Sequence, residues 1–186
     1  MRSRPLLLMA AASGTSESEP SETGQIRGRD KSIAAAMETV QVEFYRDDES
    51  RVTGWHAVRG QRTRIPGTVM ALGRGDISHD LAQYIVEAAT GTQDGFWGLL
   101  ARGATFKSVG RERTRQGRAL IAGHRGALRD SENLAAFHIA EWRAGKSTVV
   151  TQALRDAAGM FSGLKPGERR CFTWPQTNGR LVESGN

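Results

Sequence analysis

The sequence predicts an α+β fold, in which a small antiparallel sheet is packed by about four to five helices. Alternation of apolar and polar residues begins at Val40, which indicates strands in the early part of the chain. Apolar residues then recur with helical spacing between 78 and 161. Another strand-like run occurs only at 169–174. We therefore expect a sheet made of an N-terminal hairpin and a C-terminal strand that returns to it.

The hairpin is predicted from two runs that flank a turn. Residues 40–44 alternate between apolar and polar, and an acidic cluster at 47–50 is typical of a turn. Residues 51–59 then supply the return strand. A third short strand is expected at 68–72, because a Pro-Gly pair precedes it and glycines follow it.

Helices are expected between the strands. Their predicted ranges are 78–89, 95–102, 116–129, 130–145 and a fifth helix that begins with Ser147 as its cap. The start of the fourth helix is placed at Asp130 or Ser131, since both residue types favour helix N-termini. The fifth helix has one broad apolar face. That face comprises Val149, Val150, Ala153, Leu154, Ala157, Met160 and Phe161.

Composition indicates one globular domain with tails at both ends. The chain has 186 residues, and its 38% hydrophobic and 25% charged content is typical of globular proteins. We expect residues 37–175 to form the domain and 176–186 to form a flexible C-terminal tail. The single cysteine, Cys171, excludes an intramolecular disulfide and a cysteine-based zinc finger. No apolar run approaches the ~20 residues of a membrane-spanning helix, so we expect a cytoplasmic protein without a membrane partner.

Residues 1–36 differ from the rest of the chain. The segment 13–22 is rich in Ser, Glu and Pro and has no aromatic residue, a composition that cannot repay the entropy of ordering. The basic start and apolar run of residues 1–12 imitate a secretory signal, but the run is short and contains a proline. We expect a tail or a translated upstream extension, with Met37 as the native start.

The positive charge is concentrated in one segment. Residues 101–129 contain eight Lys and Arg residues and a single acid, Glu112, whereas the whole chain has a net charge of only +6. Such a segment attracts phosphates, nucleic acid or an acidic protein. An arginine-rich solvated surface without a partner is the alternative. The residues expected to contact an anionic partner are Arg111, Arg113, Arg115 and Arg118.

A possible metal site lies on the first predicted helix. His79, Gln83 and Glu87 are spaced four residues apart and therefore share one helix face. Zinc motifs of the H-E-x-x-H type use histidines at this spacing, although Gln83 is a poor zinc ligand. A divalent metal would be held by His79 and Glu87, with Asp80 as a further ligand. The alternative is an ordinary solvated helix face, in which Asp80 interacts favourably with the helix dipole.

The same region resembles a family of uncharacterised bacterial, largely actinobacterial, proteins. The residues that carry the resemblance are 78–87 and the stretch 94–103, which begins Asp-Gly-Phe-Trp-Gly. The family pattern is close to H-D-L-x-H-x-x-V-E followed by D-G-F-W-G, and the similarity covers about residues 65–105. This chain has Gln83 where the pattern has a second histidine. The resemblance implies a shared fold and no particular activity.

Two further readings concern aromatic residues and nucleophiles. Phe96 and Trp97 are flanked by glycines, so they are either core anchors or an exposed pair that stacks on a base or a partner. The chain has no G-x-S-x-G nucleophile motif and no complete phosphate-loop motif. Cys171 is expected in a strand as a small buried residue.

The sequence leads to one main hypothesis and two alternatives. The main hypothesis is a non-enzymatic domain that uses the arginine-rich segment to bind nucleic acid or an acidic protein, without a cofactor. The first alternative is a metal-binding or metal-dependent hydrolase-like domain that uses the helix face of His79 and Glu87. The second is a structural or regulatory subunit that forms homo-oligomers through Phe96 and Trp97.

Overall fold

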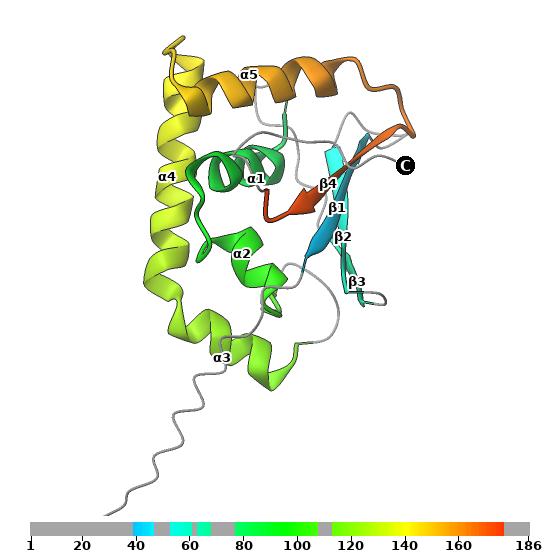
Figure 1. Ribbon diagram of the computed structural model, residues 1–186, viewed down its shortest axis with the longest axis vertical. Helices are drawn as coiled ribbons and strands as arrows, with labels where there is room; N and C mark the ends of the chain where they lie inside the picture. The colour runs from blue at the N-terminus through cyan, green and yellow to red at the C-terminus, as the bar shows by residue number, and fades with distance from the viewer. Residues whose placement is uncertain (1–38, 47–52, 61–62, 68–76, 108–112, 177–186) are drawn as a thin grey trace, which may run out of the picture. The chain divides into compact units, whose positions relative to one another are not determined.

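The sheet of this protein has four antiparallel strands in the order β3-β2-β1-β4 (Figure 1). The computed structural model describes residues 39–46, 53–60, 63–67, 77–107 and 113–176, all of which belong to the unit Ala34–Asn186. The strands are β1 (Val40–Arg46), β2 (Thr53–Arg59), β3 (Thr63–Pro66) and β4 (Arg169–Trp174). The predicted hairpin and the returning C-terminal strand are confirmed, because β1 pairs with both β2 and β4.

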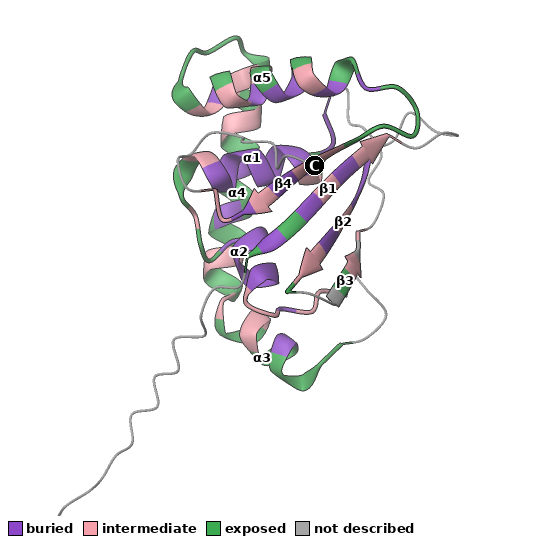
Figure 2. Ribbon diagram, turned by 45° about the vertical axis from the view of Figure 1, so that its right-hand side comes forward, coloured by how far each residue is buried: buried purple, intermediate pink, exposed green. Residues whose placement is uncertain are grey.

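Alternation along β1 gives the sheet two different faces. Val40, Val42 and Phe44 are at most 1% exposed, while the residues between them lie on the opposite face. In the register, Phe44 opposes Trp55 of β2, which is equally buried. Buried residues alternate with more exposed ones along β1 (Figure 2). One face of the sheet is therefore apolar and covered, and the other carries polar and charged side chains.

Helices cover the apolar face. The described residues form helices α1 (His79–Thr90), α2 (Phe96–Ala101), α3 (Arg115–Gly123), α4 (Arg125–Arg143) and α5 (Val149–Ser162). Phe44 lies at the centre of the core, where its ring meets those of Tyr84 from α1, Trp97 from α2 and Phe161 from α5 at centroid distances of 5.5, 5.7 and 6.1 Å. Each such edge-to-face pair adds about 0.5–1.5 kcal/mol beyond the burial of its area. The α+β class predicted from the sequence is confirmed.

The predicted boundary between the third and fourth helices is wrong. The break lies at His124 instead of at 130, and α4 continues without interruption to Arg143. Gly123 ends α3, and His124 leaves the helical conformation with φ −119° and ψ 21°. Ser131, which resembled a cap in the sequence, lies inside α4 and is 3% exposed, because its hydroxyl has a partner in the core. A residue type that favours caps was therefore used for tertiary bonding.

Two strand and cap predictions also differ from the structure. The edge strand β3 was not predicted, and it ends at Pro66, a residue that sheets tolerate at an edge. The strand predicted at 68–72 lies outside the described residues. Helix α5 is capped by Thr148 instead of Ser147, through a reciprocal capping box with Thr151. Val149, predicted on the apolar face of α5, is 80% exposed because it is the first residue of the helix.

In the part of the chain that the structure describes, every helix is too short or too polar to cross a lipid bilayer.

Candidate functional site

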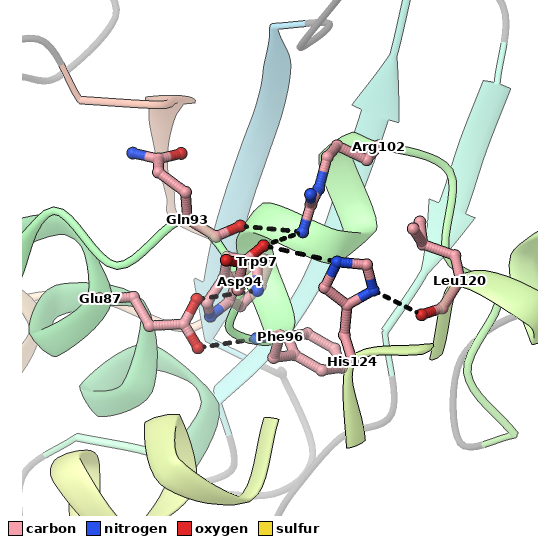
Figure 3. A network of polar contacts seen from close by, with 8 residues as sticks. All are labelled: Glu87, Gln93, Asp94, Phe96, Trp97, Arg102, Leu120 and His124. Atoms are coloured by element: carbon pink, nitrogen blue, oxygen red, sulfur yellow. Dashed lines mark hydrogen bonds and ion pairs between the residues drawn. The ribbon is translucent and has the colours of Figure 1, made fainter. Parts of the chain in front are cut away.

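The Glu87 carboxylate lies at the junction of three helices. It is 0% exposed and accepts four hydrogen bonds. The donors are the backbone N–H groups of Phe96 and Trp97 at 2.9 Å each, Gln83 Nε2 at 3.0 Å and Ser131 Oγ at 2.8 Å. Phe96 and Trp97 begin α2, so the Glu87 side chain from α1 caps the N-terminus of α2 (Figure 3). Ser131 of α4 supplies a further donor.

Burial sets the chemistry of this carboxyl group. Loss of hydration raises the pKa of Glu87, and the hydrogen bonds from Ser131, Trp97, Phe96 and Gln83 oppose that rise. Gly95 leaves no spare room beside it, since a Cβ at that position would come within 2.4 Å of Glu87 Cδ. The Glu87 carboxylate therefore joins α1 to α2 and to α4 through hydrogen bonds.

The other members of the predicted metal site have different partners. Asp80 Oδ2 accepts a hydrogen bond from Trp55 Nε1 at 2.8 Å, which fixes the start of α1 to the sheet. His79 is exposed, and its Nδ1 lies 3.6 Å from Asp80 Oδ1. Hydrogen bonding to Asp80 raises the pKa of His79. Glu87 follows His79 by eight positions, which corresponds to about 12 Å along the helix axis.

The structure thus does not bring His79 and Glu87 together. The interpretation of the stripe as a solvated helix face is wrong for Gln83 and Glu87, which are both buried, because α2 and α4 cover this side of α1. Among the residues with described positions, no group of three or more His, Cys, Asp or Glu side chains could hold a metal ion.

Trp97 and Phe96 belong to the core. Trp97 is 1% exposed, and its ring centroid lies 4.7 Å from that of Trp55. Phe96 is partly buried and packs against the same cluster. The core-anchor interpretation is confirmed, and an exposed stacking pair is excluded for Trp97. An oligomer interface built on Trp97 would therefore need this core to open.

A second polar network connects α2 to the junction of α3 and α4. Asp94 pairs with Arg102, whose Nη2 also donates to the Gln93 carbonyl oxygen at 3.4 Å. On the other side, His124 Nε2 lies 3.7 Å from Asp94 Oδ1 (Figure 3). The Nδ1–H of His124 donates to the Leu120 carbonyl oxygen at 2.9 Å. His124, which lies between α3 and α4, is thereby held against the loop before α2.

This network positions an arginine-bearing surface on α3 and the first turns of α4. Within 113–129 the chain has no acidic residue, and all of its arginines are exposed. We call these residues the α3–α4 arginine surface: Arg113, Arg115, Arg118, Arg125 and Arg129. Arg111, the remaining predicted contact residue, lies outside the described residues.

Helix α3 is anchored by its small residues. Thr114 caps the helix by accepting a hydrogen bond from the Gly117 N–H at 2.9 Å. Gly117 is buried, and a Cβ there would come within 2.5 Å of Thr105 Oγ1 and 2.8 Å of the Gly103 carbonyl oxygen. The close approach of α3 to the 103–105 segment directs its arginines outward.

A pocket of about 320 Å³ lies on the open, polar face of the sheet. It was not predicted from the sequence. Its lining residues are Glu43, Tyr45, Arg46, His56, Arg64, Gly167 and Arg169. We call it the sheet-face pocket. The lining residues of this pocket come from all four strands and from the turn before β4, so no local motif brings them together. For Glu43, Tyr45 and His56, the sequence signal was their position between the apolar residues of β1 and β2.

The centre of the sheet-face pocket is a His–Glu pair. Glu43 and His56 oppose each other in the register of β1 and β2, and His56 Nε2 lies 2.6 Å from Glu43 Oε2. Arg169 Nη1 approaches the same Glu43 oxygen at 3.5 Å. Burial lowers the pKa of His56, and this effect outweighs the opposing influence of Glu43. The imidazole is therefore neutral near pH 7 and donates its Nε2–H to Glu43.

Comparisons with protein-family models, with curated proteins and with solved structures found no match to this chain.

Proposed function

We propose that this protein is a non-enzymatic binding module that uses the α3–α4 arginine surface to hold an anionic partner, with nucleic acid as the leading candidate and an acidic protein as the alternative. The observation that carries the proposal is the charge of 113–129, a segment with five exposed arginines and no acidic residue, bordered by Glu112 and Asp130. Guanidinium groups bind phosphate oxygens through paired hydrogen bonds, which favours a phosphate backbone.

The spacing of the arginines supports contacts with one extended ligand. Arg115 and Arg118 are three residues apart on α3, and Arg125 and Arg129 are four apart on α4, so each pair shares a helix face. Neither helix has an acidic residue in its first turn to offset the positive end of the helix dipole. The positive ends of the helix dipoles and the arginine side chains therefore both favour the binding of an anion.

Rigid attachment also supports the proposal. Asp94, which pairs with Arg102 and lies near His124, connects the junction of α3 and α4 to the C-terminal end of α2. Pre-formed positioning lowers the entropy lost on binding. Arg111 lies two positions before Arg113 in the sequence, and we include it among the expected contacts.

The test is a fluorescence-anisotropy titration of labelled 20-nucleotide single-stranded and duplex DNA with the full chain. The test variant replaces Arg113, Arg115 and Arg118 by Gln. A matched control removes the same charge elsewhere, with Arg143→Gln, Lys146→Gln and Lys165→Gln at exposed positions in other parts of the chain. Arg143 ends α4, Lys146 lies between α4 and α5, and Lys165 follows α5.

We expect the test variant to lose at least tenfold in affinity and the control to lose much less. Equal losses in the two variants would show that net charge alone drives binding and would contradict the proposed surface. A labelled polyglutamate peptide is titrated in parallel. Tighter binding of that peptide than of either DNA would replace nucleic acid by an acidic protein as the partner.

A further inference from the structure

We propose that the sheet-face pocket binds one nucleotide unit, with its phosphate held by arginines and its base stacked on Tyr45. This site goes beyond the proposed function, because it uses other residues on other elements and does not depend on the α3–α4 arginine surface. The shared chemistry is a phosphate next to an aromatic base. Its source is either a free nucleotide or one nucleotide of a single strand.

Charge favours an anionic ligand in this pocket. Three guanidinium groups line it, from Arg46, Arg64 and Arg169, whereas Glu43 supplies the one carboxylate among the described lining residues. Arg64 is exposed on the edge strand β3. Arg46 Nη1 donates to the Leu164 carbonyl oxygen at 2.8 Å, which is a neutral partner. The planar guanidinium fork suits the geometry of phosphate oxygens.

Glu43, the carboxylate among the described lining residues, already has partners within the pocket. Glu43 accepts from the neutral His56 at 2.6 Å, and Arg169 lies 3.5 Å from the same carboxylate, so the arginine offsets part of its negative charge. The Nε2–H of His56 is used by Glu43, which leaves Nδ1 as a hydrogen-bond acceptor. An acceptor beside the arginines suits a ligand that also has amino or hydroxyl donors, as a nucleoside has.

An aromatic surface lies next to these groups. Tyr45 is partly buried, and one part of its ring covers Gly54, where a Cβ would come within 2.5 Å of Tyr45 Cζ. The rings of Tyr45 and His56 have centroids 5.8 Å apart. Aromatic side chains on an open sheet face, combined with nearby arginines, provide a stacking platform for a base.

The size of the pocket limits the ligand. Its volume of about 320 Å³ lies at the lower end of the roughly 300–1,000 Å³ that small-molecule sites occupy. One nucleotide unit is a better match to this volume than a dinucleotide cofactor.

The test is isothermal titration of the full chain with adenosine 5′-monophosphate, inorganic phosphate and adenosine. We expect the nucleotide to bind more tightly than either of its parts. Arg64→Gln combined with Arg169→Gln should weaken nucleotide binding at least tenfold. Tyr45→Leu should weaken binding of the nucleotide and leave that of phosphate unchanged, while Tyr45→Phe should retain both. The control, Arg143→Gln with Lys146→Gln, removes the same charge at exposed positions and should bind as the parent does.

Absence of nucleotide binding at millimolar concentration would overturn the site, and so would equal affinity of the parent and the Arg64→Gln, Arg169→Gln variant. A labelled eight-nucleotide single strand identifies the source. If this single strand binds more tightly than the mononucleotide and the mononucleotide displaces it, the natural ligand of the pocket is single-stranded nucleic acid. If the mononucleotide binds and the strand does not compete, the ligand is a free nucleotide. The variant that lacks Arg113, Arg115 and Arg118 should still bind the mononucleotide, which separates this site from the proposed function.

Discussion

Glu87 and Ser131, 44 residues apart in sequence, meet in the core with 2.8 Å between the carboxylate Oε1 and the hydroxyl. The bond joins α1 to α4, and the same carboxylate caps α2. Glu87, a candidate metal ligand in the sequence, therefore joins three helices through its hydrogen bonds. Helix α4, which this bond joins to α1, also bears Arg125 and Arg129 of the α3–α4 arginine surface.

Removal of the Glu87 carboxylate should destabilise the fold strongly. Glu87→Ala leaves the N–H groups of Phe96 and Trp97 and the Ser131 hydroxyl without their acceptor, at a cost of about 3 kcal/mol or more. Urea unfolding followed by tryptophan fluorescence measures this loss. Glu132→Ala, on the exposed side of α4, is the control and should stay within about 0.5 kcal/mol of the parent. A similar small change for Glu87→Ala would show that the network contributes little.

The same group gives stability a defined pH dependence. Because burial raises the pKa of Glu87 above its unfolded value of 4.5, the folded state holds its proton more tightly than the unfolded state. Its contribution is complete below pH 4.5 and is lost as pH rises through the folded pKa. From pH 4.5 to 7 the parent should therefore lose stability relative to Glu87→Gln, as measured by urea unfolding at each pH. A relative gain over that range would contradict the raised pKa.

The histidines should titrate in a fixed order. Hydrogen bonding to Asp80 raises the pKa of His79 above 6.5, and burial lowers that of His56 below it. NMR titration of the ring protons should place the midpoint of His79 above that of His56. Glu43→Gln should lower the His56 midpoint further, since Glu43 raises it. The reverse order of the two midpoints would contradict the environments described for the α1 start and the sheet-face pocket.

Two glycines inside helices should respond in opposite ways to alanine. A Cβ added at Gly117 of α3 would lie 2.5 Å from Thr105 Oγ1, so Gly117→Ala should lower the free energy of unfolding by about 1–3 kcal/mol. Gly159 of α5 faces open space, so Gly159→Ala should raise stability by roughly 0.5–1 kcal/mol through helix propensity. Thermal unfolding of both variants measures the difference. A stabilised Gly117→Ala protein would show that α3 does not approach the 103–105 segment closely.

Local patterns predicted the elements of this fold better than its junctions. Alternation at 40–44 predicted β1, and apolar spacing predicted α1 and α5, because these signals depend on neighbours along the chain. The break at His124 was missed, since Asp130 and Ser131 resemble caps and only the core partner of Ser131 shows otherwise. Local preference was overridden there by a tertiary bond.

The candidate sites show the same division. The arginines at 113–118 were predicted from sequence because their charge is concentrated in one segment. The environment of Glu87 was not predictable, since its donors come from α2 and α4. The sheet-face pocket was also missed, because Glu43 and Arg169 become neighbours only when β4 pairs with β1.

The salt dependence of nucleic-acid binding tests the central claim most directly. Each phosphate contact on a single strand contributes about 0.7 to the slope of log K against log salt concentration. The variant that lacks Arg113, Arg115 and Arg118 should therefore have a slope smaller by roughly 2 than that of the parent, while the control at Arg143, Lys146 and Lys165 keeps the parent slope. Equal slopes for the parent and the test variant would contradict the assignment of phosphate contacts to the α3–α4 arginine surface.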